Sequence, residues 1–125
     1  MRIFKTKSFS QFSRKKEIDD HELFKTAREV ESGLIDANLG GGVIKKRVAR
    51  QGQGKSGGFR VIICLKIGQR CFFVHGFSKS SQDNISAGEL SDFKELAKIL
   101  LSLTEDQIRA AIEAGEFQEV TELPS

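Results

Sequence analysis

Basic residues with no acidic ones among them fill the centre of this chain, and they are its first candidates for chemistry. Between Asp36 and Asp83 the sequence has nine Lys or Arg residues and no Asp or Glu. Residues 83–125 hold three basic and ten acidic residues, so the net charge of +3 conceals a strong separation. Such a segment projects a positive field, for which nucleic acid is the commonest polyanion. The alternative is a chance run of charges on a solvated face. The nine cations are Lys45, Lys46, Arg47, Arg50, Lys55, Arg60, Lys66, Arg70 and Lys79.

His75 and Phe77 lie in the same central segment and add two further kinds of chemistry. Cations bind phosphates and stabilise the charge that develops on them, and histidine is well suited to move protons near neutral pH. An exposed phenylalanine ring can stack on an unpaired base. A lone histidine on a strand can equally be a packed residue or an exposed one without a catalytic role.

A glycine-rich loop over residues 52–58 connects two of the basic stretches. Its sequence, Gly-Gln-Gly-Lys-Ser-Gly-Gly, is not a Walker A motif because the glycine spacing is wrong. Glycine amides can approach a phosphate backbone closely. The loop is therefore either a phosphate-binding element that includes Lys55 or a plain flexible hairpin.

The periodicity of apolar residues predicts the elements that must position these groups. Apolar residues recur at helical spacing before residue 36 and after residue 86, and at every second position in between. We expect strands at 1–6, 43–50, 59–67 and 70–77, and a loop at 36–42. A further helix begins near Asp20. Polar pairs that can form capping boxes predict three more helix starts: Ser8 with Gln11, Ser86 with Glu89, and Thr104 with Gln107.

A two-residue turn at Ile67 and Gly68 would place Arg60 opposite His75 on neighbouring strands. One face of the sheet is then apolar and covered by helices, and the other is basic and open. A slip of one residue would reverse the faces. The expected polar face carries Lys45, Arg47, Arg60, His75 and Phe77. The expected apolar face carries Val61, Ile63, Leu65, Phe72 and Val74, and Lys46 points to the core side.

Cys64 and Cys71 face each other in this register, so a cross-strand disulfide is conceivable. We expect both thiols to be reduced, because disulfides are rare in the cytoplasm. The two cysteines lack metal-ligand spacing, and His21 and His75 lie far apart in the sequence. We therefore expect no metal and no cofactor.

The length of 125 residues fits a single domain. No apolar run approaches the roughly 20 residues that cross a bilayer, and the first residues lack the apolar stretch of a signal peptide. These features predict a cytoplasmic protein that does not enter a membrane.

Residues 44–60 carry the most distinctive motif, IKKRVARQGQGKSGGFR. This stretch resembles the central signature of the HigB-like branch of the RelE/ParE superfamily of bacterial type II toxins. The residues around Phe77-Ser78-Lys79, Asn84-Ile85 and Glu89-Leu90 resemble the same branch. The resemblance spans residues 1–120, expected to be one toxin domain, with a polar tail at 121–125. It implies a small α+β fold of order β-α-α-β-β-β-α-α, with an antiparallel sheet of about four strands, helices on one face and a basic open face.

The resemblance also implies an activity, which is ribosome-dependent and metal-independent cleavage of mRNA. By matching positions, the catalytic candidates are Arg60, Lys45, Arg47, His75 and Lys79. Lys46, Arg50, Lys55 and Phe77 are the candidates for binding RNA or the ribosome. Relatives that cut RNA often place Tyr or His near the end of the chain. This sequence has no Tyr, and its last helices have no His, which leaves His75 or a lysine as the proton carrier.

Two other functions stay open at this point. One is a ParE-like inhibitor of DNA gyrase that cuts nothing itself, and the other is an RNA-binding module without catalysis. For a toxin, the implied partner is a cognate antitoxin with a helix-turn-helix DNA-binding domain. An acidic or apolar segment of the antitoxin is expected to lie over or beside the basic sheet. Alternatively, the acidic end of the chain itself folds back and competes for that surface.

Overall fold

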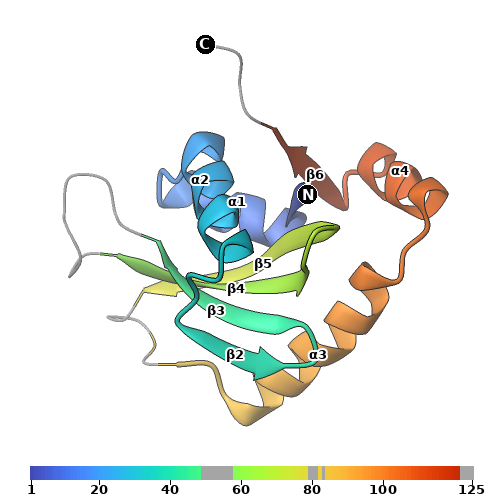
Figure 1. Cartoon of the computed structure of the whole chain (residues 1–125). Helices are drawn as coiled ribbons and strands as arrows, with labels where there is room; N and C mark the ends of the chain where they lie inside the picture. The colour runs from blue at the N-terminus through green and yellow to red at the C-terminus, as the bar shows by residue number, and fades with distance from the viewer. Residues whose placement is uncertain (49–57, 79–81, 83, 122–125) are drawn as a thin grey trace.

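The computed structural model describes residues 1–48, 58–78, 82 and 84–121. Within them the chain forms one sheet and four helices, which lie on both sides of the sheet (Figure 1). In chain order the elements are β1 (Arg2–Thr6), α1 (Lys7–Lys15), α2 (Asp20–Glu31), β2 (Ala37–Gly40), β3 (Val43–Val48), β4 (Phe59–Lys66), β5 (Arg70–Ser78), α3 (Ala87–Leu101), α4 (Glu105–Glu113) and β6 (Phe117–Val120).

The sheet has six strands in the order β2-β3-β4-β5-β1-β6. The strand β1 runs parallel to β5, and the other neighbouring pairs are antiparallel. The expected α+β class and the order of the main elements are confirmed. The expected number of about four strands is too low. The strand β2 lies where a loop was expected, and β6 follows the last helix, where no strand was expected.

Two separate apolar cores lie on opposite faces of the sheet, and they correct the expectation that helices cover one face only. On the first face, α1 and α2 pack on the sheet through Phe9, Leu23 and Val30. On the second, α3 and α4 pack on it through Ala97, Leu100 and Ile108. The face expected to be open is therefore covered by α3 over part of its area.

The helix starts follow the sequence in three places of four. Ser86 and Thr104 close the expected capping boxes of α3 and α4, and Asp19 caps α2. The exception is α1, where Thr6 and not Ser8 is the cap, because the hydroxyl of Thr6 accepts a hydrogen bond from the Phe9 amide. Among the described residues, no helix combines the length and the apolar character that crossing a membrane requires.

Candidate functional site

Arg47 and Arg60 lie directly opposite each other on β3 and β4, and this pair is the centre of the candidate site. Like charges in that position repel, so the pairing costs folding free energy unless an anion lies nearby. The one ion pair of Arg60 in the described structure is to Asp36, with 3.8 Å between Nε and the carboxylate. At that distance Asp36 offsets only part of the charge. Two cationic residues paired in this way on one sheet face are a candidate anion-binding pair.

Lys45 and His75 occupy the next row on the same sheet face. Ile62 lies between them, opposite Lys45 on β3 and opposite His75 on β5. Four of the expected polar-face residues, Lys45, Arg47, Arg60 and His75, thus share the face on which α3 packs. His75 is diagonal to Arg60 and not opposite it, because Phe77 is the residue paired with Arg60.

His75 reaches this face by a β-bulge that the sequence did not reveal. Lys66 pairs with Arg70, so the turn has three residues and not the expected two. That difference turns Phe72 and Val74 toward the α3 side, although both were expected on the other face. The register then shifts between Ile62 and Ile63, where β5 holds one extra residue. The bulge returns His75 to the face of Arg60.

The imidazole of His75 lies between two phenylalanine rings. Its centroid is 5.9 Å from that of Phe77 and 5.3 Å from that of Phe93 on α3. Its Nε2 is buried and has no hydrogen-bond partner in the described structure. Burial lowers the pKa of His75 below its usual value, and the charge of Glu89 opposes this shift. The ring is therefore neutral near pH 7.

Glu89 belongs to the same corner of the molecule through the start of α3. Its Oε1 accepts hydrogen bonds from the Ser86 amide at 2.9 Å and from Nε2 of Gln82 at 3.0 Å. The bond from the Ser86 amide is the largest cause that lowers the pKa of Glu89, so its carboxylate stays charged. The capping box that predicted this helix start also places a negative charge near His75.

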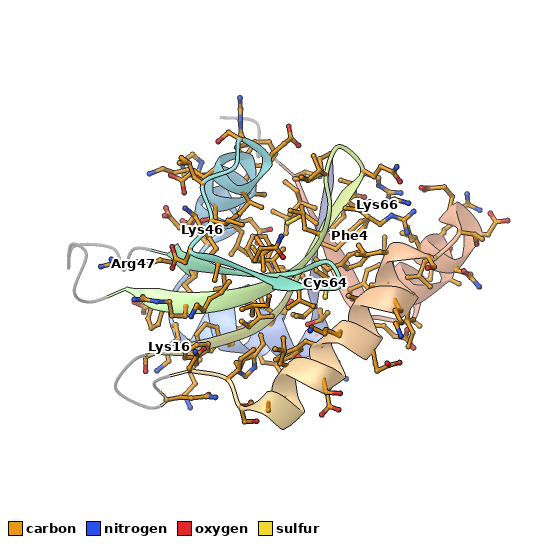
Figure 2. All side chains as sticks on the ribbon, turned by 60° about the horizontal axis from the view of Figure 1, so that its bottom comes forward. Phe4, Lys16, Lys46, Arg47, Cys64 and Lys66 are labelled. Carbon is orange, nitrogen blue, oxygen red and sulfur yellow. The ribbon has the colours of Figure 1, made fainter. Side chains whose placement is uncertain are left out.

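The remaining predicted binding residues are not gathered at this site. Lys46 lies on the α2 side of β3, 3.4 Å from the Glu29 carboxylate (Figure 2), which confirms that it points to the core side. Phe77 is 3% exposed within the second core. Its ring therefore packs in the protein, which argues against the expected stacking on a base. Lys79, Arg50 and Lys55 lie outside the described residues.

Cys64 and Cys71 also differ from the expected register. Both thiols are free, as expected, but they lie in the second and the first core respectively, on opposite faces of the sheet. A cross-strand disulfide is therefore excluded in this arrangement. Burial raises the pKa of Cys64 to about 12 and that of Cys71 as well, so neither thiol is reactive.

The acidic end of the chain makes its ion pairs away from the candidate site. Glu119 pairs with Arg2 at 3.0 Å, and Glu105 pairs with Arg2 and lies 3.8 Å from Arg70. None of the ion pairs in the described structure joins an acid of α3, α4 or β6 to Arg47 or Arg60. The structure thus does not support masking of the basic face by this chain's own acidic end.

Sequence reasoning missed three residues that shape the site. Asp36 contacts Arg60, Glu89 acts on His75 through its charge, and Phe93 packs on the imidazole ring. Glu89 and Phe93 are four residues apart and so share one face of α3. The spacing of these two residues can be read from the sequence, but the strand that this helix face packs against cannot. In the parts of the chain that are described, no three His, Cys, Asp or Glu side chains gather where they could hold a metal ion.

These features define a small α+β protein with a cationic cross-strand pair and a neutral histidine on one face of its sheet. Residues 1–120 match the family model described as the RelE toxin of the RelE/RelB toxin-antitoxin system, and the chain belongs to this family. It is thus a toxin of a toxin-antitoxin system, and an antitoxin is its partner. No curated protein matches the chain. The HigB-like branch stays a prediction.

Proposed function

We propose that this toxin is a metal-independent endoribonuclease that cuts mRNA on the ribosome and so inhibits translation. The observation that carries the proposal is the cross-strand pair of Arg47 and Arg60. An antiparallel sheet gains nothing from opposed guanidinium groups unless they bind an anion. A phosphodiester is one of the anions that guanidinium groups can bind in a bidentate manner.

The reaction fits the groups on this face. The ribose 2′-oxygen attacks the adjacent phosphorus as its proton is removed, a new bond from that oxygen to phosphorus forms, and the bond to the 5′-oxygen breaks. The products are a 2′,3′-cyclic phosphate and a 5′-hydroxyl that has taken up a proton. Arg60 and Arg47 stabilise the extra charge on the phosphoryl oxygens, and Lys45 in the next row adds a third cation. Cations fixed in place before the reaction supply much of the rate in such chemistry.

His75 is the proposed proton carrier. Its neutral ring can accept the 2′-proton near pH 7, and it lies on the same face as Arg60. Because Nε2 is buried and the imidazole packs against Phe77 and Phe93, the ring must turn for this nitrogen to reach RNA. Lys79 stays a catalytic candidate, and Arg50 and Lys55 stay candidates for binding RNA or the ribosome. Lys46 contributes to these contacts only if it leaves Glu29.

The decisive experiment is controlled expression in bacteria with two readouts, protein synthesis and DNA supercoiling. Loss of synthesis, with mRNA cut inside codons, supports the proposal. DNA damage with intact mRNA would instead indicate gyrase inhibition, and unimpaired growth would indicate an RNA-binding module without catalysis. The cognate antitoxin, proposed to carry a helix-turn-helix domain, should restore growth in either toxic case.

Arg60→Ala is the variant that tests the site itself. The loss of one transition-state cation should lower the cleavage rate on purified ribosomes by about a hundredfold or more. Lys66→Ala is the matched control, because Lys66 is an exposed cation near the other end of the same strand. A folded Arg60→Ala variant that cuts as fast as Lys66→Ala would disprove the role of Arg60.

A further inference from the structure

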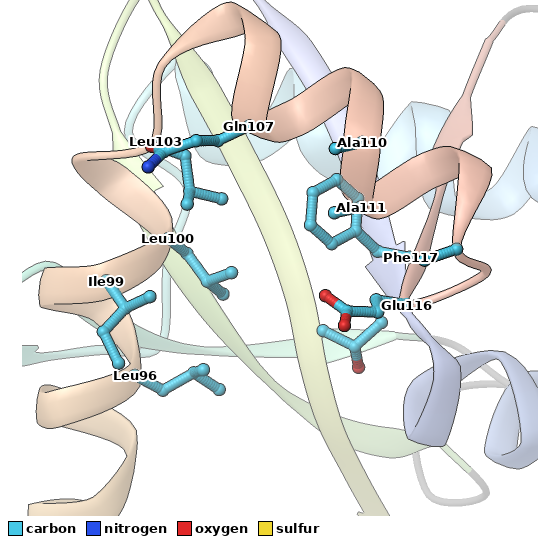
Figure 3. Close-up of a pocket in the computed structure, with 11 residues that line it drawn as sticks. Leu96, Ile99, Leu100, Leu103, Gln107, Ala110, Ala111, Glu116 and Phe117 are labelled. Atoms are coloured by element: carbon cyan, nitrogen blue, oxygen red, sulfur yellow. The ribbon is translucent and has the colours of Figure 1, made fainter.

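An open apolar groove lies between α3 and α4, far along the chain from the basic residues. Its volume is about 580 Å³, and Thr6 is among the residues that line it. Figure 3 shows the labelled side chains of α3 on one side of the groove and those of α4 on the other. The walls are aliphatic and aromatic: Leu96, Ile99 and Leu100 of α3, Ala110 and Ala111 of α4, and Phe117 of β6. The proposed RNA chemistry uses none of these side chains.

Ile99 marks this groove as an unfilled surface. It is 61% exposed, although it is a large aliphatic residue on a wall that is otherwise partly buried. The only other large hydrophobic residues so exposed in the described structure are Leu34 and Ile67. Neither of them lines this groove. An apolar groove of this size with an exposed aliphatic wall is suited to the apolar face of a partner helix.

The charges around the groove are acidic. Within residues 84–121 there are eight Asp or Glu residues and three Lys or Arg residues. Two of those three bases, Lys98 and Arg109, already pair with Glu95 and Asp106 on their own helices. The third, Lys94, lies against Gly41 from the middle of α3. Arg2 and Arg70, from outside this stretch, pair with Glu105 and Glu119. The acids left without an ion-pair partner in the described structure include Glu113 and Glu116.

Two carboxylates at the groove have no ion-pair partner in the described structure. Glu116 lines the groove, and Figure 3 shows its side chain on the side of the chain that faces α3. Glu113 lies three residues after the lining residue Ala110, which places the two on neighbouring positions of α4. An occupant that brings basic side chains to this rim would neutralise both.

We propose that this groove binds a basic amphipathic helix of the antitoxin, with its apolar face on Ile99 and its Lys or Arg side chains near Glu113 and Glu116. Two findings identify the occupant. The family has an antitoxin as its partner, and the carboxylates at the rim of the groove call for basic side chains to pair with them. The antitoxin would then hold the toxin at a surface other than the basic sheet face. This inference does not depend on the proposed cleavage of RNA.

Binding of the purified toxin to the antitoxin encoded beside it tests the apolar part. Ile99→Glu should weaken the affinity at least tenfold, because a charge replaces an aliphatic contact. Leu34→Glu is the matched control, since Leu34 is 59% exposed and follows α2 outside the groove. Equal affinities of Ile99→Glu and Leu34→Glu would overturn the proposal.

The charged part needs a second pair of variants. Glu113 and Glu31 are both exposed acids at the last position of a helix, α4 and α2 respectively. Glu113→Lys should weaken antitoxin binding several-fold at low salt, and by less at high salt, whereas Glu31→Lys should not. Unchanged or tighter binding by Glu113→Lys would show that the partner segment is not basic and would overturn the proposal. A second result would also overturn the proposal: the wild-type toxin forms dimers, and Ile99→Glu dissociates them without changing the affinity for the antitoxin. In that case a second copy of the toxin would fill the groove.

Discussion

Gly76 and Phe12 are so close that position 76 has no room for a side chain. A Cβ on Gly76 would lie 2.2 Å from Cε2 of the Phe12 ring. Phe12 belongs to α1, and Gly76 directly follows His75 in β5. The contact therefore holds α1 against the part of β5 from which the histidine reaches the opposite face of the sheet.

Gly76→Ala should destabilise the fold by about 1–3 kcal/mol, the range for an overpacked core. The same variant should also slow RNA cleavage, because the strand must move next to His75. Urea unfolding measures the first effect and the ribosome assay the second. Gly88→Ala is the control, since its Cβ would meet only Ser86 Oγ, at 3.9 Å, and should not destabilise. If the Phe12 ring is the cause, adding Phe12→Ala should cost less in the Gly76→Ala background than in the wild type.

Arg47→Gln should stabilise the folded protein while it impairs function. The change removes one of two opposed cations, and such cross-strand repulsion is worth about 0.2–1 kcal/mol. The gain should be largest at low salt and nearly vanish at high salt, where the repulsion is screened. Urea unfolding at both salt concentrations is the measurement. Destabilisation at low salt would mean that Arg47 makes favourable contacts that outweigh the repulsion.

The lowered pKa of His75 predicts a loss of stability in acid. The unfolded chain takes up the proton at about pH 6.5, whereas the folded chain resists it to lower pH. The contribution is complete above about pH 6.5 and falls as the pH drops toward the folded pKa. His75→Gln should flatten this part of the profile, and His21→Gln, at an exposed residue, should leave it unchanged. A wild-type profile that is flat between pH 7 and 5 would contradict the prediction.

The same residue has a separate catalytic prediction. If His75 carries the proton, His75→Gln should bind ribosomes normally and cut mRNA much more slowly, and His75→Phe should be equally slow. If the ring merely packs against Phe77 and Phe93, His75→Phe should be close to wild type. Equal activity of both variants and the wild type would retire His75 as a catalyst.

The sequence was enough to predict which residues lie on the basic face, but not how the strands that carry them pair with each other. Val48 pairs with Phe59. The expected strands 43–50 and 59–67 would instead have placed Arg50, the last residue of the first strand, opposite Phe59. Because this shift is two residues, it keeps every side chain on its expected face, and Lys45, Arg47 and Arg60 stay together. The turn between β4 and β5 is longer by one residue, which alone would have moved His75 to the other face. The bulge in β5 returns His75 to the expected face, and no local motif in the sequence predicted this bulge.

The elements that the sequence did not predict are those stabilised by contacts with distant parts of the chain. The strand β6 has four residues and is held by β1, more than 100 residues earlier in the chain. Its Phe117 ring packs edge-on to Phe4 and Phe72, at 5.3 Å between centroids in each pair. Such pairing leaves little trace in a stretch of only four residues, Phe-Gln-Glu-Val, whose apolar residues do not alternate. The coverage of both sheet faces was missed for a related reason, because an apolar helix face does not specify which side of the sheet it will cover.

Arg70 supports the end of α3, and its removal should be costly. The guanidinium donates hydrogen bonds from one nitrogen to the carbonyl oxygens of Leu100 at 3.1 Å and Leu103 at 2.8 Å. The side chain is only 13% exposed, so Arg70→Ala would leave these carbonyls without their donor. We expect a loss of about 2–3 kcal/mol in unfolding free energy. Arg109→Ala, at a pair exposed to solvent, should change it by no more than about 0.5 kcal/mol.

A chain that ends at Gly115 tests whether the acidic end stabilises the fold or folds back to mask the basic face. Self-masking predicts tighter binding of RNA or ribosomes after truncation. We expect instead a less stable protein without a gain in affinity, because the truncation removes the buried Phe117 and Val120 and also Glu119, one of the two ion-pair partners of Arg2. Burial of two such side chains is worth about 3–6 kcal/mol, so thermal unfolding should shift clearly downward. A chain that ends at Thr121 retains β6 and should unfold like the wild type. Tighter and salt-sensitive RNA binding by the shorter chain would show that the acidic end does compete for the basic face.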